Sequence, residues 1–224
     1  MKRFTLLFVS LAAVLSMQAQ NTREFIKQHI LDNNECKSVA ITQKSGDVMI
    51  YARNGWAAEG CPEGLMDALH ELNFDNEEIQ DVTLTDKGNW LVLFGNNGMH
   101  WNKINYDLLE KMIQYNNNAE KITTVSFNDK DEWILITTES ISASSNEILE
   151  WLGGGCDKYG QLWTACITND AIVAVYESGY KFWGDVPEDL IEQLINCSSN
   201  VYMVKMSGDA WFFRCTDGHM EYNM

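Results

Sequence analysis

A phased repeat of about 40 residues is the feature of this sequence that most constrains its fold. Five helical patterns share one arrangement, with apolar residues at i, i+1, i+4 and i+5, which is typical of short amphipathic helices. The spacings between equivalent apolar residues are 40, 43, 40 and 42, counted over Ile26, Met66, Leu109, Leu149 and Ile191. A period of roughly 20–50 residues indicates a repeat architecture. The sequence therefore predicts five tandem units.

The first turns of these helices agree in chemistry as well as in phase. Each begins at a residue that favours helix starts: Thr22, Pro62, Asn105, Ser145 and Pro187. Two residues later the side chain is acidic in four of the five units, as the helix dipole favours, and Gly64 is the exception.

Apolar strands and polar turns follow each helix, which predicts a hairpin or a three-strand meander in every unit. The middle strand is apolar on both faces, as in residues 90–94, 133–136 and 172–175. Both faces of such a strand must be covered, by helices and by a neighbouring unit, a folded-over sheet or a ligand. Trp90, Trp133 and Trp211 share one position on this strand and are predicted to be core residues.

The fold class predicted from this order is α+β, with five α-β-β(-β) repeats forming antiparallel sheet and helices on one side. The units are placed at residues 20–59, 60–102, 103–142, 143–184 and 185–224 of a single domain. Two arrangements remain open, a curved continuous sheet and a closed, propeller-like ring of five units. The helix-then-meander order resembles beta-lactamase-inhibitor-like and PepSY-like secreted domains at the level of pattern only, so no site residues follow from it.

Residues 1–19 have the pattern of a cleavable signal peptide. Lys2 and Arg3 precede an apolar stretch over residues 4–15, and small or polar residues surround a cleavage point after Ala19. The apolar stretch is shorter than the roughly 20 residues that a membrane-spanning helix needs. No cysteine follows it directly, which argues against a lipid anchor. The sequence predicts a secreted or periplasmic protein, not inserted in a membrane after the leader is removed.

The chain is strongly acidic, with a formal net charge of −16. Such a surface repels phosphate backbones and anionic lipid heads, so nucleic acid and membranes are poor partners. A protein or a glycan is the expected partner, and the oligomeric state is left open.

Six cysteines in an exported chain suggest disulfides, because the compartments outside the cytoplasm are oxidising. The most local pairing is Cys36 with Cys61, Cys156 with Cys166, and Cys197 with Cys215. It would staple the two ends of the array and leave the middle free of cysteine.

No catalytic, cofactor or metal motif stands out. Acidic residues recur at the first hairpin turn of each unit (Asp47, Asp86, Asp129 with Asp131, Asp170 and Asp209), where turn geometry explains them better than a cation site. The four histidines lack ligand spacing, and no nucleophile elbow or phosphate-binding loop is present. The sequence therefore predicts no catalytic residue, no metal and no cofactor.

Trp56, Trp101 and Trp183 form a second tryptophan set, at the third strand just ahead of a helix start. They suit either packing on the next helix or a row of exposed aromatic platforms for a ligand. We therefore predict a non-enzymatic binding module that presents a repeat-built surface to a protein or glycan. The alternatives are an extracellular hydrolase with unidentified carboxylate catalysts, and an inhibitor or assembly partner of another exported protein.

Overall fold

The computed structural model describes residues 22–33 and 35–224, and the predicted signal peptide lies outside them. The helices are the first helix (residues 22–33), α2 (Glu63–Phe74), α3 (Tyr106–Asn117), α4 (Asn146–Tyr159) and α5 (Glu188–Asn196). The strands are β1 (Ser38–Ala40), β2 (Asp47–Tyr51), β3 (Gly55–Glu59), β4 (Ile79–Leu84), β5 (Trp90–Phe94), β6 (Gly98–Asn102), β7 (Ile122–Phe127), β8 (Trp133–Thr137), β9 (Ile141–Ala143), β10 (Leu162–Ile167), β11 (Ala171–Tyr176), β12 (Gly179–Gly184), β13 (Val201–Ser207), β14 (Ala210–Cys215) and β15 (Met220–Asn223). Among the described residues, no helix is both long enough and apolar enough to cross a membrane.

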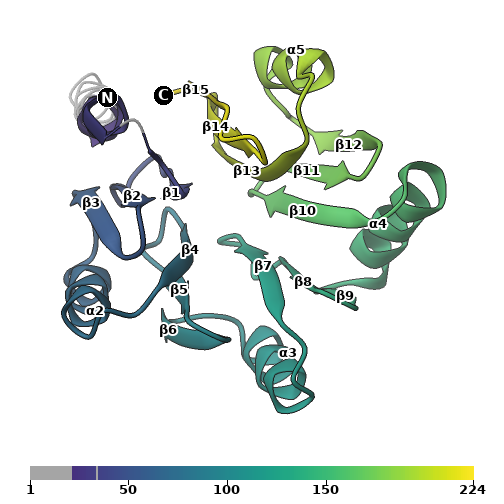
Figure 1. Ribbon diagram of the computed structural model, residues 1–224. Coiled ribbons are helices and arrows are strands. Elements are labelled where there is room, and N and C mark those ends of the chain that lie inside the picture. The colour runs from purple at the N-terminus through teal and green to yellow at the C-terminus, as the bar shows by residue number, and fades with distance from the viewer. Residues whose placement is uncertain (1–21, 34) are drawn as a thin grey trace, which may run out of the picture.

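The predicted architecture of five helix-and-strand repeats is confirmed. Each unit contributes one antiparallel sheet of three strands in chain order, from β1-β2-β3 to β13-β14-β15. The sheets surround a common axis, with the first strand of each innermost and the helices on the periphery (Figure 1). Within the described chain, no strand of one unit pairs with a strand of another, so the continuous-sheet alternative is wrong.

The helices begin where the sequence predicted. The Asn105 side chain accepts hydrogen bonds from the backbone N–H groups of Asp107 and Leu108, and the Ser145 side chain accepts one from Ile148. Pro62 and Pro187 cap α2 and α5 without a side-chain bond, through their fixed φ. Local chemistry alone thus sets the phase of the repeat.

Each hydrophobic core is a helix packed between two consecutive sheets. The middle strand serves two cores at once: Trp133 and Leu135 pack with α3, whereas Ile134 and Ile136 pack with α4. This division explains why the strand is apolar on both faces. Trp90, Trp133 and Trp211 are all buried, as predicted, and each lies opposite the last or next-to-last residue of the preceding strand.

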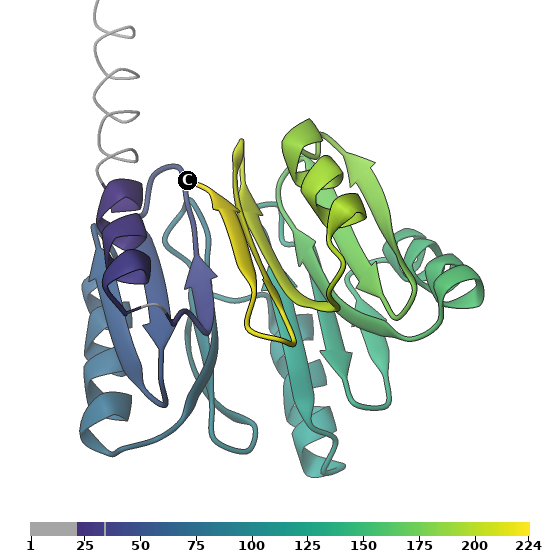
Figure 2. The ribbon, with the colours of Figure 1, turned by 45° about the horizontal axis from the view of Figure 1, so that its top comes forward.

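The fifth such core joins the last unit to the first and closes the ring. Ile26 and Ile30 of the first helix share a cluster with Met49 of β2 and Phe212 of β14. The first helix and β15 accordingly lie side by side in both views (Figures 1 and 2). At the turn end of this seam, Gln43 Nε2 donates to the Ser207 carbonyl at 2.7 Å. Gly208 has a φ of +57°, a conformation that favours glycine, and a Cβ there would lie 2.4 Å from Gln43 Nε2, so a larger residue would displace the Gln43 side chain.

A largely buried ion pair joins two of the innermost strands, β4 and β13 (Figure 1). Lys205 Nζ of β13 lies 2.8 Å from Asp81 Oδ1 of β4, and both side chains are nearly inaccessible to solvent. Ser38 Oγ donates to the same carboxylate at 2.6 Å, and Lys205 also donates to the Val82 carbonyl at 3.1 Å. The pair therefore connects units 5 and 2 past unit 1.

The structure does not contain the predicted disulfides, since all six cysteines are free thiols. Cys36 and Cys61 belong to different cores, as do Cys156 and Cys166, because successive elements direct them to opposite sides of a sheet. Burial raises the pKa of Cys36 and of Cys61 to about 12, which keeps both thiols unreactive. Only Cys197 and Cys215 are neighbours, with their Sγ atoms 3.4 Å apart, and a disulfide between them stays a prediction.

Candidate functional site

The first hairpin turns of the units meet at one end of the axis and are bonded to one another. Three consecutive boundaries share one link, in which a backbone N–H donates to a side-chain oxygen of the next turn. The pairs are Gln43 with Asp86 Oδ1 (2.6 Å), Lys87 with Asp129 Oδ1 (3.3 Å), and Asp129 with Asn169 Oδ1 (3.1 Å). These acidic side chains therefore stabilise the hairpin turns and the contacts between neighbouring units. Among the described residues, no three His, Cys, Asp or Glu side chains are grouped so as to hold a metal ion.

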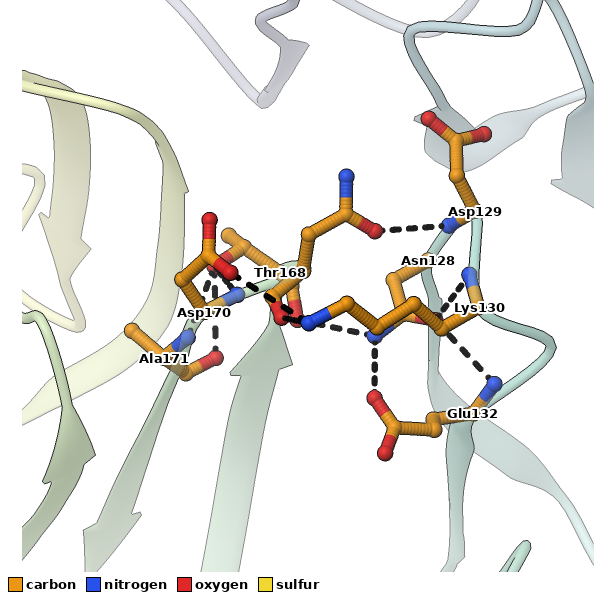
Figure 3. Close-up of polar contacts among 8 residues, drawn as sticks. Asn128, Asp129, Lys130, Glu132, Thr168, Asp170 and Ala171 are labelled. Atoms are coloured by element: carbon orange, nitrogen blue, oxygen red, sulfur yellow. Dashed lines mark hydrogen bonds and ion pairs between the residues drawn. The ribbon is translucent and has the colours of Figure 1, made fainter.

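Asn128 is the centre of the network between units 3 and 4 (Figure 3). Its Oδ1 accepts the backbone N–H groups of Lys130 and Glu132, while its Nδ2 donates to Glu132 Oε2 at 2.7 Å and to the Thr168 carbonyl at 2.8 Å. Lys130 Nζ crosses the same boundary to the Asn169 carbonyl and to Asp170 Oδ1. Two neighbouring turns are thus held in fixed relation beside a pocket.

That pocket arises where the repeat loses a tryptophan. In units 2, 3 and 5, Trp90, Trp133 and Trp211 fill the space beside the first turn of the unit's own helix. In unit 5 the contact is also polar, since Trp211 Nε1 donates to Asp189 Oδ2 at 3.0 Å.

Units 1 and 4 carry other residues at this position. In unit 1 it is Asp47, which accepts a hydrogen bond from Thr22 Oγ1 at 2.5 Å and one from the Thr42 N–H at 2.8 Å. Burial raises the pKa of Asp47, an effect that these two hydrogen bonds oppose. In unit 4 the position is Ile172, opposite Ile167. Its smaller side chain borders a pocket of about 420 Å³.

The unit 3–4 pocket, as we call it, has an apolar floor and a charged rim. It is lined by Lys130, Glu132, Ile148, Ile167, Thr168, Asn169, Asp170, Ala171, Ile172, Trp183, Gly184 and Asp185. Trp183, which is 37% exposed, forms one wall and is itself supported by Trp151, with ring centroids 5.8 Å apart. Lys181 Nζ lies 4.5 Å from the centroid of Trp151 and holds that second ring in place. The volume lies within the range of small-ligand sites.

The three tryptophans predicted as a binding row are not brought together. Trp56, Trp101 and Trp183 lie on the third strands of units 1, 2 and 4, paired with Ile50, Leu91 and Ile172. These are three different register positions. Trp56 is half-buried and packs edge-on against His70, Trp101 is 43% exposed, and Trp183 alone borders the unit 3–4 pocket.

Sequence reasoning missed the pocket, although a signal was present. Four units place a Trp or a buried Asp at the first or second residue of the middle strand, and the interruption at Ile172 marks the open site. Considered by itself, Ile172 looks like an ordinary residue of a buried strand. Its significance depends on knowing that an indole fills the same space in three other units.

Gly64 offers a test of this interpretation, because it occupies the α2 position that Asp189 occupies in α5. Trp90 Nε1 is buried and has no hydrogen-bond partner among the residues that the structure describes. A Cβ on Gly64 would lie 3.7 Å from the Trp90 ring. We expect Gly64→Asp to raise the free energy of unfolding by about 1–2 kcal/mol, through the new acceptor, the helix dipole and the loss of glycine flexibility. Urea unfolding would measure it.

Gly64→Ala separates these contributions, since it supplies only helix propensity. In a Trp90→Phe background, which lacks the indole N–H, the advantage of Asp over Ala should shrink to the dipole contribution. Equal stability of Gly64→Asp and Gly64→Ala in the parent protein would contradict the proposed hydrogen bond.

Comparison with known proteins gives distant structural likenesses. No family model and no curated protein matches the sequence. Among solved structures, human WBSCR16 aligns with a TM-score of 0.37 and 11% identity, over 84% of this chain and 61% of that one. YCF48 bound to D1 peptide aligns at 0.31 and 11%, over 84% and 50%, and the C-terminal domain of gp131 from bacteriophage phiKZ at 0.33 and 15%, over 64% and 48%. The chain thus spans about half to three fifths of these proteins. Its likeness to beta-lactamase-inhibitor-like and PepSY-like domains stays one of element order.

Proposed function

We propose that this chain is a secreted, non-enzymatic binding module and that the unit 3–4 pocket is its ligand site. The observation that carries the proposal is an open, apolar-floored pocket beside an exposed, rigidly supported tryptophan, at a position that other units fill from within. Exposed aromatic rings that border a pocket are the side chains that most often dominate binding energy. Export is proposed from the leader pattern alone.

The pocket carboxylates are placed for binding rather than for acid-base catalysis. Glu132 Oε2 accepts a hydrogen bond from Asn128, and Asp170 pairs with Lys130 on the surface, where the Asp170 side chain is 72% exposed. A general acid is typically a carboxyl group that burial keeps protonated near neutral pH. The hydrogen-bonded turns instead hold a mixed set of donors and acceptors in fixed positions, which suits recognition.

The test uses variants that close or strip the pocket without unfolding the protein. Ile172→Trp inserts the indole that three other units carry, and Trp183→Ala removes the aromatic wall. Trp101→Ala is the matched control, because it removes a similarly exposed tryptophan from unit 2. Ligands would be sought on a glycan array and among exported proteins of the source cells, with thermal melts recorded for every variant.

We expect the captured ligand to bind at least about tenfold more weakly to Ile172→Trp and to Trp183→Ala, and unchanged to Trp101→Ala. All three variants should melt close to the parent protein. Retention of the ligand by Ile172→Trp, or an equal loss with Trp101→Ala, would show that the pocket is not the site. Failure of the parent protein to bind any protein or glycan would contradict the function itself.

A further inference from the structure

The equivalent sites of the repeat show which chemical group fits the unit 3–4 pocket. Trp90 and Trp133 are the first residues of β5 and β8, and Trp211 and Ile172 are the second residues of β14 and β11. All four occupy one register position, paired with Leu84, Phe127, Met206 and Ile167. In each of the three filled units, an indole packs among a helix, its own sheet and the preceding one. The walls around Ile172 follow the same plan, with Ile148 of α4 on the helix side. They therefore have the spacing that accommodates a flat aromatic ring.

The polar contact made by the unit 5 indole also has a counterpart in unit 4. Trp211 Nε1 donates to Asp189, the second residue of α5, and the second residue of α4 is Glu147. Glu147 is exposed, so its carboxylate is free to accept an N–H or O–H from a ring bound beside α4. An aromatic group with a donor at its edge would thus reproduce the internal contact.

The charges around the rim of the pocket favour a ligand of one sign of charge. Glu132, Asp170 and Asp185 surround the pocket, against the single ammonium group of Lys130, which is already bonded to Asn169 and Asp170. The whole chain adds a net charge of −16. Such a field attracts cations and repels anions.

We infer that the unit 3–4 pocket receives an aromatic side chain of a protein partner, a Trp or Tyr flanked by Lys or Arg. The inference rests on the proposed function and names its ligand class. The partner supplies its aromatic side chain from outside, whereas units 2, 3 and 5 each fill this position with a tryptophan of their own. The basic residues of the partner meet the acidic rim. A glycan is the competing ligand that the test must separate.

The probes are three small molecules titrated into the ¹⁵N-labelled protein, followed by NMR. Tryptamine carries the indole with a positive charge, indole-3-acetate carries the same ring with a negative charge, and an N-acetylglucosamine trimer represents a glycan. We expect tryptamine to shift the amides of Ile172 and Asp185 with a Kd of about 1 mM or tighter. Indole-3-acetate should bind at least about tenfold more weakly. Ile172→Trp should abolish the shifts, and Trp101→Ala should leave them unchanged.

Several results would overturn the inference. Equal binding of the two indoles would remove the charge argument, and absence of tryptamine binding, or shifts that survive Ile172→Trp, would remove the aromatic site. If the sugar alone binds and Ile172→Trp blocks it, the inference is wrong while the proposed function stands. If ligands captured by the parent protein still bind Ile172→Trp, the pocket is not the site, and this inference fails together with the site assignment in the proposed function. Failure of the parent protein to bind any protein or glycan would contradict the binding function itself.

Discussion

Replacing Lys205 with methionine is expected to lower the free energy of unfolding by about 3–5 kcal/mol, because it leaves the buried Asp81 carboxylate without its cation. Asp81 would keep only the Ser38 hydroxyl, and the Val82 carbonyl would lose its donor. Methionine preserves most of the apolar stem, so the loss reports the charge and not the packing. Urea unfolding near neutral pH provides the measurement.

The double variant Asp81→Asn, Lys205→Met is the control, since it removes both charges from the axis. The double variant should recover more than half of the stability that Lys205→Met loses, because most of that loss comes from leaving the Asp81 charge buried and unpaired. A Lys205→Met protein as stable as its parent would mean that water reaches the axis and solvates Asp81.

Trp133→Ala should destabilise the protein by about 3–5 kcal/mol, the usual effect of truncating a buried tryptophan. Only 4% of Trp133 is exposed, and it packs with Leu108, Met112 and Val125 in the core shared by α3 and the sheets on either side. Trp90→Ala and Trp211→Ala should behave alike, with the loss of the bond to Asp189 added in the second case. Thermal and urea unfolding of single variants would measure these effects.

The tryptophans of the second set, Trp56, Trp101 and Trp183, should differ from one another in how much their replacement by alanine destabilises the protein. Trp101→Ala and Trp183→Ala remove well-exposed rings and should change stability by less than about 1 kcal/mol. Trp56→Ala should fall between the groups, because its ring packs on His70 and against the core around α2. Equal destabilisation by Trp133→Ala and Trp183→Ala would assign Trp183 to the core and weaken the proposed site.

Those parts of the fold that depend on neighbouring residues could be predicted from the sequence. Local chemistry starts the helices at Pro62, Asn105, Ser145 and Pro187. The strands that are apolar on both faces predict that other elements pack against both faces. Ring closure could not be predicted, because Gln43 and Ser207 are 164 residues apart and nothing in either turn identifies the other. Two of the three cysteine pairs, Cys36 with Cys61 and Cys156 with Cys166, failed for a related reason: closeness in sequence does not say to which side of a sheet a thiol points.

The candidate site was predicted only in part. Trp183, which borders the pocket, was among the predicted binding residues. The prediction placed it in a row with Trp56 and Trp101, but the register of the third strands puts the three at different positions. The pocket beside it combines the turns of two units, and the residue that opens it, Ile172, is informative only by comparison with Trp90, Trp133 and Trp211. A pocket that exists because a smaller side chain replaces a tryptophan is hard to recognise from a single sequence.

The uninterrupted order of strands within each sheet has a consequence for how this ring assembles. Because every blade is complete in itself, the chain can build an open array step by step through nearest-neighbour contacts. Only the seam between units 5 and 1 closes a loop of about 164 residues. The length-dependent entropy of that closure is about 4–5 kcal/mol. Until the seam forms, the face that carries Phe212 lacks the first helix and the β2 residue Met49 that cover it. Two unclosed molecules then present complementary apolar ends to each other, so the speed of intramolecular closure decides between a monomeric ring and chains joined end to end.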